Sequence, residues 1–197
     1  MITLCMDTST KYLVLGLIRD HELIASVVKD CWKRQSEEIF PCLEEMMNSV
    51  SLSSDDIDQV VITEGPGSYT GVRIAMTVAK VFCVMGNKPL YTIGTLQLMA
   101  GRQYCRAVLD ARGSRVYTAV LQDGKYVEEP CVKSCEEVKA SNEDVVVIGD
   151  GSLVGKEDNW QNLAENFLAL EDSWVLAENA NLVTPEYLKS SEAYFVK

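Results

Sequence analysis

Residues 64–73 read EGPGSYTGVR, and this stretch decides the fold. It follows the apolar run 60–63 and precedes an apolar segment of helical character, 74–85, so the local order is strand, tight loop, helix. Its glycines let the backbone turn sharply, while Ser68 and Thr70 can cap the helix, whose first N–H groups otherwise lack partners. Such a loop can hold an anion, or it can be a well-capped connection without a ligand. Its spacing matches neither the P-loop nor the dinucleotide fingerprint.

Around this loop the hydrophobic pattern predicts an alternation of strands and helices. The elements expected in this half are strands at 2–6, 12–18, 23–28, 57–63 and 90–93 and helices at 37–50, 71–85 and 95–103. A polar turn at 19–22 joins the second and third strands, and Gly86 with Pro89 ends the helix 71–85. The first half therefore begins with three antiparallel strands and continues with alternating helices and strands.

After residue 105 the same pattern begins again. The elements expected there are strands at 107–110, 116–122, from 126 onward and 145–148 and a helix at 134–140. The turns at Gly113 and at Asp123-Gly124 separate successive strands, as in the first half. The second half resembles a degenerate copy of the first. The pattern predicts an α/β protein with mixed sheets in two lobes, 1–103 and 104–197.

Composition limits the classes of protein to which the chain can belong. With 197 residues, 47% of them hydrophobic, it can bury a core without metal or disulfide support. Seven cysteines form an odd set without a CxxC pair, so we expect them to be reduced and structural. The N-terminus lacks the pattern of a secretory signal, and no stretch approaches the roughly 20 apolar residues of a membrane span. We therefore expect a cytoplasmic protein that does not bind membranes.

Charge argues against direct nucleic-acid binding. The chain has 18 basic and 29 acidic residues, a net charge of −11, and its cations are scattered along the sequence. A protein that grips tRNA needs a basic face to neutralise phosphates. A role in tRNA chemistry would therefore need a partner that supplies the positive surface.

Five segments, in order along the chain, resemble those of the TsaB (YeaZ) family, which acts with TsaD in the bacterial biosynthesis of N6-threonylcarbamoyladenosine at position 37 of tRNA. They are residues 64–73, MDTST at 6–10, DAR at 110–112, GDG at 149–151 and EAYFVK at 192–197. The resemblance is most specific at 64–73. After about residue 150 the chain is shorter than expected of the family.

The resemblance implies the two-lobe ASKHA fold of actin-like ATPases, which is ribonuclease H-like. In that fold an aspartate at the end of the first strand of each lobe approaches nucleotide phosphates and metal. The resemblance thus implies a degenerate phosphate site at the lobe or subunit interface, with Asp7, Thr8, Ser9, Gly65, Gly67, Ser68 and Asp110. Two plainer interpretations stay open: Asp7 can cap a turn with Thr8 and Ser9, and Arg112 can pair with Asp110.

Residues typical of catalysis are few. TsaD has paired histidines four residues apart that hold a metal ion, and the matching stretch 93–99 contains none. The only histidine of the chain, His21, lies in a predicted turn. Ser68 has no evident histidine partner and no HExxH motif exists, which argues against a peptidase of the M22 type. We expect no metal site, no catalytic residues and no required cofactor.

Two helices carry more apolar surface than one sheet face needs. Each stripe can cover its own sheet, but the helix 71–85 is apolar on more than one face. By resemblance, these two helices bind TsaD. The residues expected at this interface are Ile39, Phe40, Leu43, Met46, Met47, Val72, Ala75, Val78, Ala79 and Phe82.

The sequence analysis thus predicts a non-catalytic scaffold subunit that binds and activates TsaD as a heterodimer, works with the ATPase TsaE, and forms a homodimer when alone. The alternative is a small actin-like kinase or ATPase that uses Asp7, Asp110 and the loop 64–73.

Overall fold

Strand β1 (Ile2–Asp7) lies at the centre of the larger sheet, and this position explains why both of its faces are apolar. The computed structural model describes residues 1–141 and 145–188. The strand order of the larger sheet is β10-β5-β4-β1-β2-β3. Its other strands are β2 (Tyr12–Arg19), β3 (Glu22–Asp30), β4 (Gln59–Thr63), β5 (Leu90–Ile93) and β10 (Val175–Leu176).

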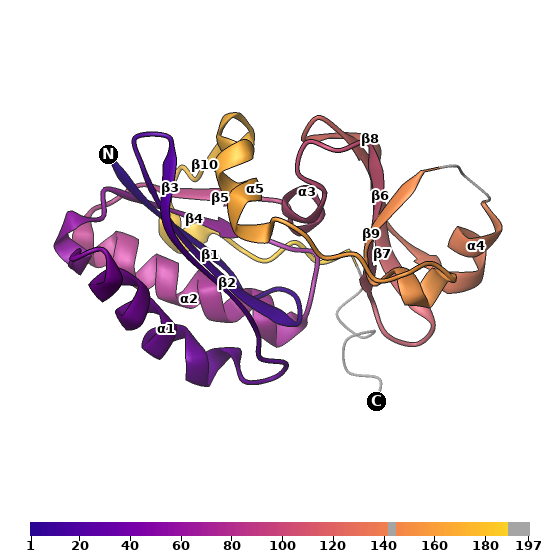
Figure 1. Ribbon diagram of the computed structural model, residues 1–197, viewed down its shortest axis with the longest axis horizontal. Helices are drawn as coiled ribbons and strands as arrows, with labels where there is room; N and C mark the ends of the chain where they lie inside the picture. Colours follow the sequence, from indigo (N-terminus) through magenta and orange to yellow (C-terminus); the bar gives the residue numbers. More distant parts are fainter. Residues whose placement is uncertain (142–144, 189–197) are drawn as a thin grey trace.

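Two long helices cover one face of this sheet (Figure 1). They are α1 (Gln35–Ser49) and α2 (Tyr69–Gly86). Strand β2 shows how the sequence divides between the two faces, because Leu13, Leu15 and Leu17 pack toward these helices. Val14 and Ile18 point to the opposite face and join a second core. The alternation of side chains along a strand thus supplies both cores from one apolar run.

The second lobe repeats the topology of the first. Its sheet has the order β8-β7-β6-β9, with strands β6 (Cys105–Asp110), β7 (Arg115–Gln122), β8 (Lys125–Ser134) and β9 (Val146–Gly149). β6, β7 and β8 are antiparallel and β9 is parallel to β6, just as β4 is parallel to β1 in the first lobe. Helix α4 (Cys135–Ala140) follows β8. The expected two-lobe ASKHA fold with mixed sheets is confirmed.

One hydrophobic core is shared by the two lobes. It contains Cys5 and Val14 of the first sheet together with Leu109 and Tyr117 of the second. Between the sheets lie α3 (Thr95–Ala100) and α5 (Leu163–Ala169), whose Phe167 is fully buried in this core. The shared core restricts movement of one lobe relative to the other.

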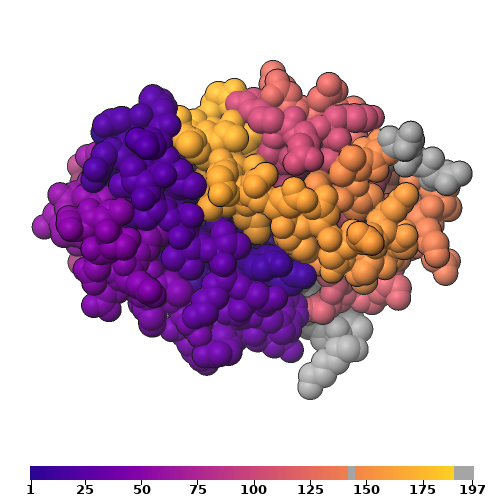
Figure 2. Space-filling model, in the orientation of Figure 1, coloured from indigo at the N-terminus to yellow at the C-terminus, as the bar shows by residue number. Residues whose placement is uncertain are grey.

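The C-terminal part of the described chain returns to the first lobe. α5 contacts β2 and β3, and β10 pairs antiparallel with β5 at the edge of the first sheet. Figure 2 shows the orange and yellow segments between the indigo first lobe and the pink second lobe. Residues 163–188 thus lie against the first lobe, although the sequence analysis assigned them to the second.

Short 3-10 turns complete the described chain: η1 (Ser54–Asp56), η2 (Gly151–Val154), η3 (Glu171–Ser173) and η4 (Ala180–Leu182). Helix α3 is shorter than the predicted helix 95–103, because Gly101 adopts a φ of +58° and ends it. The segment 192–197, which entered the family resemblance, lies outside the described residues.

The cysteines and α2 bear on two further expectations. All seven cysteines are free thiols, five of them buried, as expected.

By length and composition alone, α2 is the one helix within residues 1–141 and 145–188 that could cross a membrane. It lies along the sheet with Val72, Ala75 and Ala79 buried, as a core helix does. The cytoplasmic location stays a prediction.

Gly71→Ala should destabilise the protein although Gly→Ala within a helix usually stabilises by about 0.5–1 kcal/mol. A Cβ at Gly71 would lie 2.2 Å from the carbonyl oxygen of Thr8, so the backbone must shift. We expect the free energy of unfolding in urea to fall by about 1–3 kcal/mol. Gly86→Ala, at the other end of the same helix, is the control, because its Cβ would meet only the flexible Lys88 side chain. A stabilised Gly71→Ala variant would contradict the close approach.

Candidate functional site

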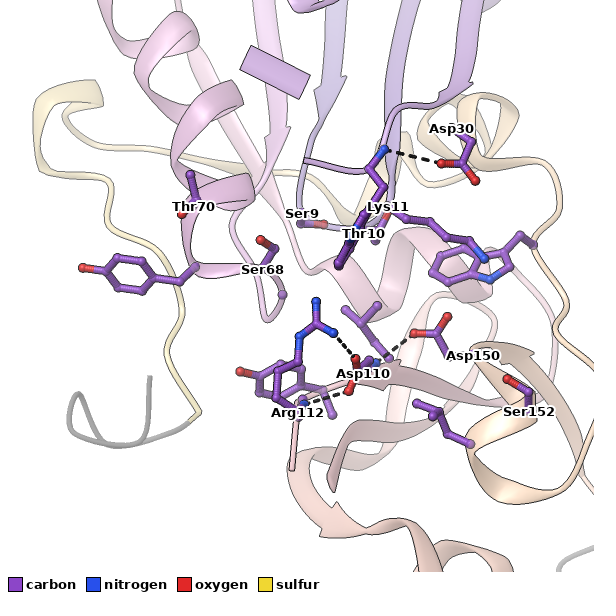
Figure 3. Close-up of a pocket in the computed structure, with 18 residues that line it drawn as sticks. Ser9, Thr10, Lys11, Asp30, Ser68, Thr70, Asp110, Arg112, Asp150 and Ser152 are labelled. Carbon is purple, nitrogen blue, oxygen red and sulfur yellow. Dashed lines mark hydrogen bonds and ion pairs between the residues drawn. The ribbon is translucent and has the colours of Figure 1, made fainter. Parts of the chain in front are cut away.

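A cleft of about 600 Å³ lies between the lobes, and we call it the interlobe cleft (Figure 3). From the first lobe it is lined by Ser9, Thr10, Lys11, Asp30, Trp32, Gly67, Ser68, Tyr69 and Thr70. From the second lobe and the segment after it, the lining residues are Leu109, Asp110, Ala111, Arg112, Tyr117, Asp150, Ser152, Leu153 and Trp160. Four of the seven residues expected at a phosphate site therefore line one cleft: Ser9, Gly67, Ser68 and Asp110.

Asp7 does not line the cleft. Its side chain is buried, and its Oδ1 accepts hydrogen bonds from Ser9 N at 2.8 Å and from Thr63 Oγ1 at 2.5 Å. Burial raises the pKa of the Asp7 carboxyl, and the hydrogen bonds from Ser9 and Thr63 oppose this shift only in part. The bond from Ser9 N is that of the turn-capping role that the sequence left open, and the bond from Thr63 ties β1 to β4.

Thr8 is buried as well and connects β1 to α2. Its Oγ1 donates to the Gly71 carbonyl oxygen at 2.6 Å and accepts from Ala75 N at 3.0 Å. The hydroxyl is therefore occupied by the first turns of the helix. Of Asp7, Thr8 and Ser9, only Ser9 lines the cleft, and its Oγ accepts from Thr95 Oγ1 at 3.1 Å.

The three glycines of the loop 64–73 allow the protein's own backbone to approach. A Cβ on Gly67 would lie 2.6 Å from the Ser9 carbonyl oxygen, and one on Gly65 would lie 2.8 Å from that of Glu186. Gly65 also has a φ of +117°, which favours glycine. Ser68 N donates to the Ser9 carbonyl at 2.8 Å, and Ser68 Oγ caps α2 by accepting from Gly71 N at 3.2 Å. Much of the loop is thus engaged by neighbouring backbone, while Ser68 and Thr70 face the cleft.

At the opposite wall of the cleft, Asp110 is paired with Arg112, as the sequence suggested. The guanidinium Nη1 lies 2.9 Å from Asp110 Oδ2, and Arg112 N donates to Oδ1 at 2.7 Å. The same guanidinium lies 4.9 Å from the ring centroid of Trp32 on the first lobe. Arg112 is therefore held by an ion pair within its own wall and reaches the other wall by a cation–π contact with Trp32.

The inner end of the cleft combines aromatic rings with both signs of charge. Lys11 Nζ lies over the rings of Tyr12 and Trp160, at 5.4 and 5.2 Å from their centroids, and 3.9 Å from Asp158 Oδ2. Asp150 Oδ2 accepts from Asp110 N at 2.9 Å, and burial raises the pKa of Asp150. Three lining carboxylates, Asp30, Asp110 and Asp150, and two engaged cations, Lys11 and Arg112, leave no concentrated positive field for a polyphosphate.

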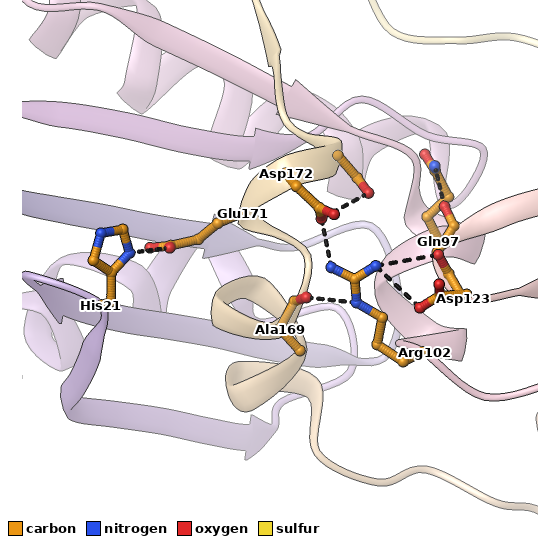
Figure 4. Close-up of polar contacts among 9 residues, drawn as sticks. His21, Gln97, Arg102, Asp123, Ala169, Glu171 and Asp172 are labelled. Atoms are coloured by element: carbon orange, nitrogen blue, oxygen red, sulfur yellow. Dashed lines mark hydrogen bonds and ion pairs between the residues drawn. The ribbon is translucent and has the colours of Figure 1, made fainter.

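A metal site does not emerge from the part of the chain that the structure describes. Within it, no group of three or more His, Cys, Asp or Glu residues could hold an ion. His21 lies in the β2–β3 turn as expected, and its Nδ1 contacts Glu171 Oε2 at 2.5 Å (Figure 4). Beside it, Arg102 donates to Ala169 O and pairs with Asp123 and Asp172, which fixes α5 to the hairpin of the second lobe. Both contacts hold the C-terminal segment in place.

A second concavity, of about 870 Å³, lies on the outer side of α1 and α2, and we call it the α1/α2 groove. Apolar side chains supply most of its lining: Ile39, Phe40, Ile74, Val78, Val81, Phe82 and Met85. Its polar rim includes Asp55, Arg73 and Lys88. The exposed fractions of Phe40, Val81 and Met85 are 63%, 54% and 83%. Such exposure of large apolar side chains on one face is typical of an interaction surface.

Half of the interface residues expected from the sequence are not accessible there. Ile39, Met46, Val72, Ala75 and Ala79 are at most 3% exposed, because they pack on the sheet. The other five expected residues, Phe40, Leu43, Met47, Val78 and Phe82, are exposed or half-buried. Of the apolar residues of α2 outside the first helical stripe, Val81, Val84 and Met85 are exposed, whereas Met76 and Cys83 are buried.

Comparison with known proteins shows the family to which the chain belongs. A family model described as TsaD, tRNA N6-adenosine threonylcarbamoyltransferase, matches residues 28–154, which is more than half of the chain. The TsaB protein of Bacillus subtilis, named for tRNA threonylcarbamoyladenosine biosynthesis, is 32% identical over 127 residues. That alignment covers 62% of this chain and 56% of the relative, so the chain matches little more than half of that relative's length.

Two other relatives match over nearly the whole chain. A TsaB protein of Buchnera aphidicola is 23% identical over 201 residues, with 93% of this chain and 91% of the relative covered. The solved structure of YeaZ from Pseudomonas aeruginosa superposes with a TM-score of 0.76 at 22% identity, covering 95% of this chain and 99% of that one. At this identity the structural likeness shows a shared fold.

Asp7→Asn should remove a pH dependence of stability. Because the pKa of native Asp7 is raised above 3.8, its contribution to stability is fully present below the unfolded pKa and is lost as pH rises through the native pKa. The amide keeps Oδ1 as an acceptor but cannot ionise. We therefore expect the free energy of unfolding of Asp7→Asn, minus that of the wild type, to increase with pH from about 3.8 upward and then level off. Urea titrations between pH 3.5 and 7 measure this difference; a flat or opposite trend would contradict the burial of the charge.

Proposed function

The chain belongs to the TsaD family, with TsaB (YeaZ) proteins among its relatives, and from this premise we propose that it is a non-catalytic subunit in tRNA threonylcarbamoyladenosine biosynthesis. The partner we propose is TsaD, bound as a heterodimer. The observation that carries the proposal is the α1/α2 groove, a large apolar concavity on the outer surface of a chain from this family.

The groove has the properties of an interface that is covered in a complex. A partner helix laid along it would bury Phe40, Val81 and Met85, and burying large apolar side chains is the dominant favourable term in association. Two facing helices with a groove between them suit another helix or helix pair. In the absence of TsaD the same surface can pair with a second copy of the chain.

The scaffold role follows from the position of the groove. Tyr69 and Thr70 line both the groove and the interlobe cleft, so a partner in the groove lies at the start of the glycine loop. We propose that the chain holds TsaD in an active conformation and takes part with it in recruiting TsaE. The chain itself would need no cofactor.

Contact with tRNA would be indirect. The net charge of −11 argues against a phosphate-binding face on this chain, and three of its arginines, Arg102, Arg106 and Arg112, are paired with carboxylates. The phosphate-binding surface would then come from the partner.

The second candidate function is that of a nucleotide-dependent enzyme of the actin-like type. The observation in its favour is the interlobe cleft, where Ser68 and Asp110 face each other between two lobes of the ASKHA fold. Against it stand the capping role of Asp7 and the engagement of Asp110 by Arg112.

A charge in the groove should abolish the complex. Val81→Asp would bury an unpaired carboxylate under the partner, and we expect its affinity for TsaD of the same genome to fall by at least about 100-fold. Size-exclusion chromatography with light scattering and a calorimetric titration measure this. Val127→Asp is the control, because Val127 is 59% exposed on β8, away from the groove. Wild-type affinity of Val81→Asp would exclude this interface.

The isolated chain should not turn over nucleotide. Because Asp7 is buried in its network with Ser9 and Thr63, we expect no ATP hydrolysis above background with Mg²⁺ present. A phosphate-release assay measures this. Hydrolysis that disappears in Asp7→Ala but persists in Asp55→Ala, whose carboxylate lies at the groove rim, would favour the actin-like enzyme.

A further inference from the structure

Arg73 is an exposed cation at the rim of the groove without a carboxylate partner within residues 1–141 and 145–188. It lies in the second turn of α2, next to the apolar lining residue Ile74. The other cation at this rim, Lys88, differs, because its Nζ donates to the carbonyl oxygens of Ser54, Asp55 and Ile57. These bonds engage the three donors of the Lys88 ammonium, so of these two rim cations Arg73 is the one with N–H donors available to a partner.

Two tyrosines hold the Arg73 side chain in one position. Its Nε donates to Tyr187 Oη at 2.9 Å, and its guanidinium carbon lies 4.4 Å from the ring centroid of Tyr69. The rings of Tyr69 and Tyr187 are stacked, with centroids 5.4 Å apart and an interplanar angle of 21°. We call this arrangement the Arg73 clamp. It uses Nε and one face of the guanidinium and leaves Nη1 and Nη2 as donors.

Tyr187 reaches the clamp because the C-terminal segment is attached along α2. Ala177 N donates to Leu90 O at 2.9 Å, and Lys80 Nζ donates to Asn181 O at 3.1 Å. Glu186 N then donates to Glu64 O at 2.7 Å, which brings the segment against the glycine loop. The clamp thus joins the glycine loop, α2 and the C-terminal segment beside the groove.

A guanidinium fixed in this way has a defined chemistry. Its two Nη groups form a planar fork that fits a carboxylate in a bidentate pair. Arginine normally loses side-chain entropy on binding, and a side chain already held by a hydrogen bond and a ring loses less. A cation at an apolar rim contributes most to binding when the partner excludes water from the ion pair that the two proteins form.

We propose that Arg73, held by Tyr69 and Tyr187, receives a carboxylate of the protein that fills the α1/α2 groove, an inference that rests on the proposed binding of TsaD there. Arg73 is then a specificity-determining contact of this interface, and Tyr187 is a positioning residue that acts through it. The ion pair between Arg73 and this carboxylate fixes where the partner sits along the groove. The apolar lining adds buried area but does not select one position of the partner.

Titrations of TsaD from the same genome with variants of the full chain, at low and high salt, test this. We expect Arg73→Ala to weaken binding by about tenfold at low salt and by less at high salt, because it removes one ion pair. Arg73→Lys should recover only part of the affinity, because it keeps the charge and loses the fork. Lys125→Ala removes the same charge from the second lobe and should bind as the wild type does.

Tyr187→Phe separates positioning from folding. It keeps the ring stacked on Tyr69 and removes the acceptor for Arg73 Nε, so we expect unchanged thermal stability and an affinity loss of about threefold. In the Arg73→Ala background the same change should have no effect on affinity, because Tyr187 acts through Arg73. Additive effects of the two substitutions would overturn the positioning role.

Val81→Asp distinguishes failure of this proposal from failure of the interface itself. If Val81→Asp abolishes binding while Arg73→Ala keeps wild-type affinity and salt dependence, the carboxylate contact is overturned and the proposed function stands. If Val81→Asp also binds as the wild type does, both are overturned. If Arg73→Ala weakens only self-association of the chain, a second copy supplies the carboxylate and the proposal is overturned.

Discussion

The close contact between the end of β1 and the glycine loop fixes the rest of the structure. Gly67 and Gly71 bring their backbone against the carbonyl oxygens of Ser9 and Thr8, at distances that no Cβ would permit. The Thr8 hydroxyl then bonds the first turns of α2. This contact sets where α2 begins and how it lies on the sheet. Because α2 supplies one wall of the α1/α2 groove and its first residues border the interlobe cleft, both concavities depend on it.

The two lobes behave as one unit because their apolar residues form a common core. α3 and α5 fill the space between the sheets, and the Arg102 contacts with Ala169, Asp123 and Asp172 attach α5 to the second lobe. An actin-like enzyme that closes on a nucleotide needs lobes that move apart and together. Here the shared core connects the lobes, and Arg112 of the second lobe, paired with Asp110, also contacts Trp32 of the first lobe across the cleft. This architecture supports the scaffold role that we propose.

The two concavities differ in the chemistry that they offer. The cleft is lined by both polar and apolar side chains, and Arg112 and Asp110 in its wall are paired, whereas the groove is mostly apolar and several of its large side chains are exposed. Desolvation of the groove is therefore favourable on binding, while a ligand in the cleft must replace existing ion pairs. The Arg73 clamp adds one available charge to the apolar surface.

The order of the elements up to about residue 149, the duplication of the lobes and the family resemblance could be predicted from the sequence. Hydrophobic periodicity and turn residues are local signals, so strand β5 was predicted at its observed bounds and α2 within two residues. The glycine loop was informative for the same reason, since its residues are consecutive. Pairing of Arg112 with Asp110 was also predictable, because the two lie two residues apart.

Which helix residues are buried and where the C-terminal segment lies depend on tertiary packing. Ile39 and Phe40 are equally apolar neighbours, but the rotation of α1 on the sheet buries the first and exposes the second. α5 and β10 are short and carry weak patterns, and their place is set by the surface of the first lobe that they cover. The contact of Arg73 with Tyr187 spans 114 positions, a separation at which residue spacing holds no information about proximity.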